Sequence, residues 1–163
     1  MKKNKIKDTG LEITELSFGT SSLGSMPDTY GYEVPEDRAQ KTLNRFFQGP
    51  VNMLDTSRNY AMGESEKRIG KAIKENGGWP KGFLLSTKLD RNMDTLVLDK
   101  NRARESLEES LKTLNVDSVD ILFLHDPEYA KDITDITKKD GAMDELFKIK
   151  NEGLAKAVGV AMG

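Results

Sequence analysis

Four ionisable residues stand at places in this sequence where side chains of separate elements would meet. Asp55, Lys88 and His125 each close a short apolar stretch, and Tyr60 lies in the loop just after the first of these stretches. If the stretches are parallel strands, their carboxyl ends lie at one open face, where sheets of this kind carry catalytic groups. The four residues therefore predict a catalytic site at that face.

Each residue taken alone also has a purely structural explanation. An Asp at a strand end often bonds loop amides, and a loop Tyr often packs against its neighbours. Lys88 is one of 25 basic residues, and a lone His such as His125 is more often a hydrogen-bonded structural residue than a catalytic one. The combination of all four, more than any single residue, favours a functional site.

The first two of these residues belong to a unit that spans residues 51–73. An apolar run stops at Asp55, a polar loop carries Tyr60, and a helix follows. The helix is indicated by acidic residues suited to a first turn and by apolar residues at helical spacing behind them: Glu64, Glu66, Ile69, Ala72 and Ile73. The unit reads as one strand, loop and helix with ionisable groups at the joint.

The same rhythm continues along the chain. Residues 5–13 predict a small hairpin with its turn near Thr9 and Gly10, placed across the bottom of the fold. Strand candidates follow at residues 16–20, 51–55, 83–88, 119–125 and 155–161, with four amphipathic helices between them. This alternation predicts a parallel sheet with right-handed crossovers, strands in sequence order and helices on the outer face.

The helix ends carry recognisable signals. Pro35 precedes two acids that open the first helix, Asp99 and Asn101 are possible caps of the third, and Asn115 is its terminator. The fourth helix is marked by Met143, Leu146, Phe147 and Ile149 and is stopped by Gly153.

Two phosphate-binding motifs are not present. Gly19 and Gly24 have the spacing of a P-loop, but Ser25 stands where the phosphate-binding Lys should be. No GxGxxG follows a strand, which weakens the case for a doubly wound dinucleotide-binding fold.

Composition limits the classes of partner. The 163 residues include 25 basic and 27 acidic ones, so a net charge of −2 gives no electrostatic case for nucleic acid or an anionic membrane. The longest strongly apolar run, Ile121 to Leu124, cannot span a bilayer, and no apolar segment follows the basic start to make a secretory signal. The chain has no Cys, so disulfides and Cys-ligated metal are excluded. We expect a cytoplasmic protein with no metal site.

Several ordered segments together resemble the aldo-keto reductase superfamily, over nearly the whole chain. They are GTSSLG after the first strand, NMLDTSRNYAMGESEKRIGKAI with its Asp-x4-Tyr spacing, LLSTK, SLKTLNVDSVDILFLHDP and KNEGLAKAVGVA. The resemblance implies an α/β fold of the (β/α)₈ TIM barrel type and hydride transfer between NADP or NAD and an aldehyde, ketone or sugar. The long loop at residues 21–32 looks closest to an aldose-dehydrogenase-like branch.

By this resemblance Asp55, Tyr60, Lys88 and His125 match the catalytic tetrad, and Gly19, Thr20 and Asp55 are the cofactor-binding residues. A phenol is a poor acid or base at neutral pH unless a neighbouring cation favours its charged form, and Lys88 would supply that cation to Tyr60. Asp55 would hold the ammonium charged and oriented, while His125 could donate a hydrogen bond to the substrate oxygen.

The resemblance stops short of a whole barrel, which typically needs about 250 residues. We expect one partial barrel domain over residues 1–163, with the hairpin in 1–15 and five strands with their helices in 16–163, and an incomplete cofactor site. Ala161 and Met162 stand where a Ser-Asn pair commonly binds the nicotinamide carboxamide.

The expected partners are a small carbonyl or sugar substrate and either a second copy or the missing C-terminal half. The alternative function is a non-catalytic truncated barrel that acts as a binding or assembly module, as in the channel-associated β subunits of this fold.

Overall fold

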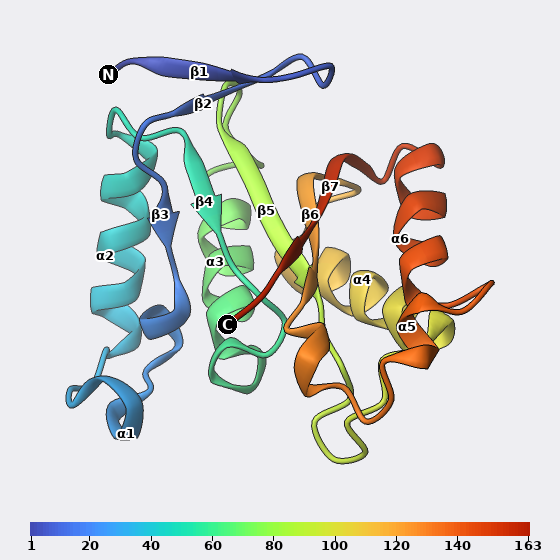
Figure 1. Ribbon diagram of the computed structural model, residues 1–163. Helices are drawn as coiled ribbons and strands as arrows, with labels where there is room; N and C mark the ends of the chain where they lie inside the picture. Colours follow the sequence, from blue (N-terminus) through green and yellow to red (C-terminus); the bar gives the residue numbers. More distant parts are fainter.

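The computed structural model describes residues 1–163, and its strands form two sheets (Figure 1). Strands β1 (Lys3–Ile6) and β2 (Leu11–Thr14) make an antiparallel hairpin. The main sheet is parallel in the order β3-β4-β5-β6-β7. Its strands are β3 (Phe18–Gly19), β4 (Met53–Asp55), β5 (Leu84–Leu89), β6 (Val119–His125) and β7 (Ala155–Ala161). The predicted hairpin, the parallel pairing and the strand order are confirmed.

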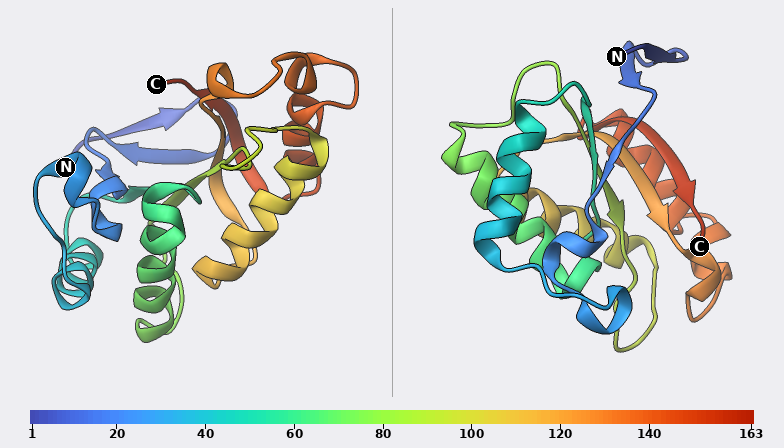
Figure 2. Two further views of the ribbon diagram at one scale, coloured as in Figure 1. Left: turned by 90° about the horizontal axis from the view of Figure 1, so that it is seen from below. Right: turned by 90° about the vertical axis from the view of Figure 1, so that its left-hand side faces the viewer.

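Four helices lie side by side along the outer side of the curved main sheet (Figure 2). They are α2 (Glu36–Phe47), α3 (Glu64–Glu75), α4 (Lys100–Leu114) and α6 (Ala142–Asn151). The connections hold the short elements η1 (Ser21–Gly24), α1 (Pro27–Tyr30), η2 (Tyr60–Gly63), η3 (Pro127–Tyr129) and α5 (Thr134–Thr137). A sheet covered on one side by the helices that link its strands is an incomplete (β/α)₈ barrel.

Local signals explain where these helices begin, end and touch. The Asp99 side chain accepts a hydrogen bond from the Arg102 amide at 2.8 Å, which caps the first turn of α4. Helix α4 ends at Leu114 and is followed by Asn115, whose φ of 57° is left-handed. Helix α3 approaches this end closely through Gly70, where a Cβ would lie 2.0 Å from the Thr113 carbonyl oxygen. Any larger residue at position 70 would therefore force the two helices apart.

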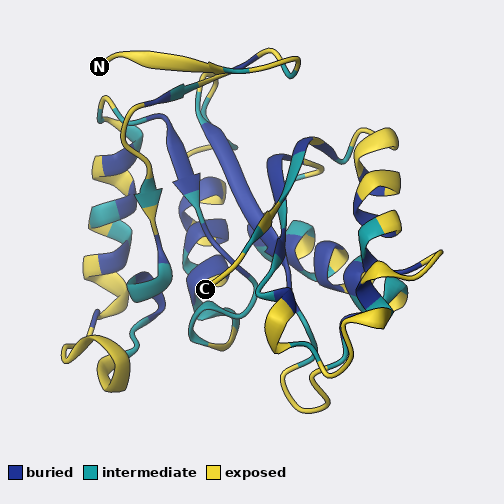
Figure 3. Ribbon diagram, viewed as in Figure 1, coloured by how far each residue is buried: buried dark blue, intermediate teal, exposed yellow.

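Most of the apolar core lies between the sheet and the helices. It is one cluster of 23 buried residues, and β5 is buried along its whole length (Figure 3). A second, smaller cluster, here called the inner cluster, lies on the opposite face of the sheet and consists of Leu11, Met53, Leu84, Ile121 and Ala157. The hairpin contributes Leu11 to it and so closes one end of the sheet, as the sequence predicted.

Two sequence-based details differ from the structure. The first main strand is only two residues long, and Leu16, predicted to belong to it, is exposed and precedes it. Phe147 shares α6 with buried Leu146 and Ile149, yet its side chain is 51% exposed. In both cases apolar character marks the element, but the neighbouring segments decide which residues are covered.

A single side chain joins the hairpin to the amino end of the main sheet. Asn52 Oδ1 accepts hydrogen bonds from the Thr14 amide at 2.9 Å and the Thr14 hydroxyl at 3.1 Å. Its Nδ2 donates to the carbonyl oxygens of Glu12 at 2.8 Å and Gly82 at 3.3 Å. The buried amide of Asn52 therefore holds three segments of chain together.

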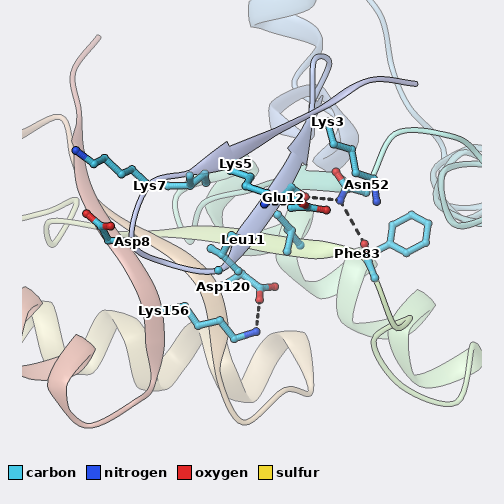
Figure 4. A pocket seen from close by; sticks show the side chains of 14 residues that line it. Lys3, Lys5, Lys7, Asp8, Leu11, Glu12, Asn52, Phe83, Asp120 and Lys156 are labelled. Atoms are coloured by element: carbon cyan, nitrogen blue, oxygen red, sulfur yellow. Dashed lines mark hydrogen bonds and ion pairs between the residues drawn. The ribbon is translucent and has the colours of Figure 1, made fainter.

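A cavity of about 790 Å³ lies beside this joint (Figure 4). The hairpin side chains Lys3, Lys5 and Glu12 line it together with Asn52, while Lys156 donates to Asp120 at 2.8 Å on its far wall. The cavity therefore sits at the amino ends of the strands, at the opposite end of the sheet from the ionisable residues that close β4 and β6. None of the helices has both the length and the apolar character required to cross a bilayer.

A carboxyl group is buried in the layer between α3 and the sheet. Glu66 is fully buried, and one of its oxygens accepts a 2.6 Å hydrogen bond from the Thr87 hydroxyl, while the other has no partner. Burial raises the pKa of this carboxyl to about 7, partly offset by the hydrogen bond from Thr87 and by the nearby Ser110 hydroxyl, and the charge of Asp90 raises it further. The sequence predicted an acid in the first turn of a helix, and the structure shows that this acid is buried.

We predict that this carboxyl makes stability depend on pH. Between pH 4.5, where the unfolded chain releases the proton, and about 7, where the folded protein does, the folded state holds more protons. Stability therefore falls as pH rises through this window and levels off above it, by at most roughly 3 kcal/mol. Glu66→Gln removes this loss, so its stability relative to the parent should increase from pH 4.5 to pH 8 in urea unfolding. The exposed Glu75→Gln on the same helix is the control, and an equal pH profile for both variants would contradict the assignment.

We also predict that Asn52→Ala loosens the hairpin. The substitution leaves several buried partners unpaired, at about 1–3 kcal/mol each, so we expect a loss of about 2–4 kcal/mol in urea unfolding. Amide hydrogen exchange should rise first in β1 and β2. Asn76→Ala, which removes an exposed amide, is the matched control. Equal losses from the two substitutions would mean that Asn52 does not join the segments.

Candidate active site

The ionisable residues gather at the carboxyl ends of the strands. Asp55 is the last residue of β4, Lys88 is next to last in β5 and His125 ends β6. Each lies two or four residues after a member of the inner cluster, so the alternation of side chains along a strand directs all three to the inner face. Tyr60 opens η2, the turn just beyond β4.

The ammonium group of Lys88 is at the centre of the contacts. Its Nζ donates to Asp55 Oδ2 at 2.7 Å, to the Thr56 carbonyl oxygen at 2.7 Å and to the Tyr60 hydroxyl at 3.0 Å. The residue is only 5% exposed. An ammonium has three donor hydrogens, so all of them are taken by these three oxygens.

These bonds leave the Tyr60 proton free. Because the Tyr60 oxygen accepts from Lys88, its own hydrogen points elsewhere and is available to a third group. The Lys88 Nζ also lies 4.6 Å from the centroid of the Tyr60 ring, where the ring electrons attract the cation. The arrangement can therefore deliver or accept a proton at the Tyr60 hydroxyl, with a cation beside the oxygen that would become negative.

Asp55 is held on both of its oxygens. While Oδ2 accepts from Lys88, Oδ1 accepts a 2.8 Å hydrogen bond from the Ser86 hydroxyl on the neighbouring strand. Residues 55 and 86 are direct partners in the pairing of β4 with β5. The carboxylate therefore has a fixed orientation and places its charge beside the ammonium.

The backbone that presents Tyr60 has an unusual conformation. Ala61, Met62 and Gly63 have φ angles of 51°, 55° and 90°. Residues other than Gly rarely adopt such positive φ angles. Glycine suits position 63 because of its φ of 90°, a backbone conformation that side chains make costly. The sharp turn is what places the phenol above the end of β4.

His125 faces the same opening but bonds to different residues. Its ring lies edge-on to the Tyr60 ring, with centroids 5.8 Å apart and planes at 81°. No hydrogen bond joins it to Tyr60, Lys88 or Asp55. Its Nδ1 is instead 2.5 Å from Asp90 Oδ1 and 3.2 Å from the Ser57 hydroxyl.

The two residues predicted only as cofactor contacts have different surroundings. Gly19 is exposed, pairs with Asp55 in the sheet, and has no atom within 4 Å of the place a Cβ would occupy. Thr20 is fully buried, and its hydroxyl donates to the Asp55 carbonyl oxygen at 2.8 Å. Gly19 therefore borders open space, whereas the Thr20 side chain is already engaged.

Sequence reasoning missed the residues that hold the four in place. Ser86 and Asp90 lie two residues before and after Lys88. Strand alternation placed them on the same side as Lys88, which is the signal that could have found them. Ser57 carried no such signal, because it acts from a loop through a partner 33 residues away.

The chain is similar in sequence to proteins of one known family. The model of the family described as "Aldo/keto reductase family" matches residues 15–162. The L-galactose dehydrogenase of Arabidopsis thaliana is 34% identical over 153 residues, which cover 94% of this chain and 46% of that protein. The aldo-keto reductase YhdN of Bacillus subtilis is 32% identical over 164 residues, 99% of this chain and 47% of that protein. The chain thus spans about half the length of these relatives.

A solved structure agrees with the sequence match. The holo form of the aldo-keto reductase AKR11C1 from Bacillus halodurans superimposes with a TM-score of 0.78 at 26% identity. The match covers 99% of this chain and 50% of that protein. The described strands and helices therefore correspond to one half of that structure.

Proposed function

The chain belongs to the aldo/keto reductase family, and from that premise we propose that it carries the acid–base groups of a cytoplasmic NAD(P)-dependent oxidoreductase. The reaction would exchange hydride between the nicotinamide and an aldehyde, ketone or sugar. One observation carries the proposal: the buried Lys88 ammonium that joins Asp55 to the Tyr60 hydroxyl. We treat residues 1–163 as a single partial barrel domain for this function.

In the proposed reaction Tyr60 transfers the proton. During reduction the substrate carbonyl oxygen receives the Tyr60 proton, while its carbon accepts the hydride, which is the chemistry that the bound nicotinamide supplies. The oxygen of Tyr60 becomes a phenolate, and Lys88 stabilises it from 3.0 Å. In the reverse direction the alcohol proton returns to Tyr60. Asp55 keeps Lys88 oriented, and His125 binds the substrate oxygen from the other side.

The proposed cofactor contacts on this chain are Gly19, Thr20 and Asp55. The open space beside Gly19 suits a planar ring placed against the backbone, next to Asp55. The Thr20 hydroxyl would contribute only by holding this strand end in place, because it already bonds to the Asp55 carbonyl. Ala161 and Met162 offer no polar side chain at the end of β7. We therefore propose that NADP or NAD requires further residues for tight binding.

A sugar is the substrate class that we favour. The support is the similarity to the Arabidopsis thaliana L-galactose dehydrogenase, whose printed name identifies a sugar substrate for that protein. The long loop between β3 and α2 begins at the same strand end as Gly19 and would border such a substrate.

A non-catalytic binding module is the second candidate function. The apolar residues at the end of β7 favour it, because they provide no group to hold a nicotinamide carboxamide. Fluorescence titration of the chain with NADPH and NADH separates the two candidates. Saturable binding that enhances the nicotinamide fluorescence supports the catalytic role, whereas no binding even in a completed barrel supports the module.

We predict that the Tyr60 hydroxyl is essential in a completed barrel. The chain would be joined to the C-terminal part of YhdN that it does not match, and carbonyl reduction with NADPH and NADH would be measured. Tyr60→Phe keeps the ring but removes the proton, so turnover should fall by about 10²- to 10⁴-fold. Ser118→Ala, which removes an exposed hydroxyl just before the amino end of β6, should have little effect. Unchanged turnover in Tyr60→Phe would eliminate it as the proton donor.

We further predict that the 163-residue chain reduces no carbonyl by itself and associates through its sheet edges. Each of β3 and β7 pairs with only one neighbour, so each presents unpaired backbone groups. Sedimentation velocity should reveal association that weakens in Val160→Lys, which places a charge on the half-exposed end of β7. Phe147→Lys also introduces a lysine at an exposed apolar residue, but on α6 and away from the edge, and should leave association intact. A monomer at all concentrations, or turnover by the chain alone, would contradict the proposal.

A further inference from the structure

A second buried charged residue holds the histidine. Asp90 follows β5, is 1% exposed, and has Oδ1 2.5 Å from His125 Nδ1. Its Oδ2 accepts from the Ser57 hydroxyl at 2.6 Å and from the Asn59 amide at 3.1 Å. Two hydrogen bonds to one oxygen favour the charged carboxylate, which can only accept.

The bonding of Ser57 fixes the direction of the contact with His125. A hydroxyl has one hydrogen, and Ser57 gives it to Asp90 in the shorter of its bonds. Toward His125 Nδ1, 3.2 Å away, Ser57 therefore presents a lone pair. Both neighbours of Nδ1 are acceptors, so Nδ1 must carry a proton.

The other ring nitrogen is left without a hydrogen bond. Nε2 has only Asp126 Oδ2 near it, at 3.7 Å, which is too far for a hydrogen bond. Although Nε2 has no hydrogen-bond partner, it is not buried, so it remains accessible. It is the only His125 atom through which the ring can bind a substrate oxygen.

We propose that Asp90 is a positioning residue that keeps Nδ1 of His125 protonated and reserves Nε2 for the substrate. What this tautomer means for substrate binding rests on the proposed function. A neutral ring held this way has a lone pair at Nε2 and accepts a hydrogen bond from an alcohol hydroxyl. Only the doubly protonated ring, with its charge beside Asp90, can donate to a carbonyl oxygen.

His125 therefore serves the two directions of the reaction in different protonation states. The groups that face it are Asp90, Asp126 and Ser57. The Tyr60 ring lies edge-on to it, and Lys88 is bonded to the Tyr60 hydroxyl. The charge of Asp90 also reaches Glu66 on the other side of β5. Carbonyl reduction should accordingly depend on the charged ring, and alcohol oxidation on the neutral one.

The test uses the fact that His125 is the only histidine. In the 163-residue chain labelled with ¹⁵N-histidine, one pair of ring nitrogen signals reports the tautomer directly. At a pH where the ring is neutral, we expect the Nδ1 signal to be that of a protonated nitrogen and the Nε2 signal that of a bare one.

Asp90→Asn should exchange the two nitrogen signals. The Asn oxygen would take the bonds from Ser57 and Asn59, and its amide would then donate to Nδ1, which forces the proton to Nε2. Asp126→Asn is the matched control, because it neutralises the carboxylate near the other nitrogen and should leave Nδ1 protonated.

A neutral parent ring with its proton on Nε2 overturns the proposal, and so does a folded Asp90→Asn chain that keeps the proton on Nδ1. If Asp90→Asn does not fold, the parent spectrum decides alone. The spectrum reports the tautomer without any turnover measurement. An unexpected tautomer would therefore not contradict the role of Tyr60, and an inactive role for Tyr60 would not contradict the tautomer.

Discussion

The buried ammonium of Lys88 is the constraint on which the arrangement of the site depends. A charge removed from water is costly unless every one of its donors finds an acceptor. Its three acceptors come from the end of β4, from the residue after it, and from the turn that carries Tyr60. Satisfying this one cation therefore fixes the relative positions of two strand ends and a loop, and the phenol is held within reach of the same charge.

Strand β5 carries polar residues on both of its faces, and the residues of each face form hydrogen bonds with different partners. Ser86 and Lys88 bond on the inner face with Asp55, whereas Thr87 between them donates to the buried carboxyl of Glu66 on the outer face. The close approach of α3 to α4 at Gly70 brings that carboxyl under the helix layer. Packing of the outer helices and placement of the inner charges are thus linked through one strand.

The two ends of the sheet differ in the kinds of residues and contacts they carry. At the amino ends, Asn52 and the hairpin close the inner cluster with neutral hydrogen bonds and apolar contacts. At the carboxyl ends, charged residues lie in or beside short turns that have positive φ at Ala61, Met62 and Asp126. This division, with stability at one end and reactive groups at the other, is typical of sheets built from repeated strand and helix units.

The sequence by itself determined the order of elements and the four residues at the strand ends. Apolar periodicity marks strands and helices locally, and parallel strands necessarily bring Asp55, Lys88 and His125 to one face. Only the tertiary structure decided which polar residues are buried and what they bond. The sequence indicated that Glu66 opens a helix and that Phe147 belongs to another helix, but not that the first is buried and the second exposed. The contact of His125 with Asp90 spans 35 positions. Burial and pairing depend on neighbours from other elements, and no local pattern records those neighbours.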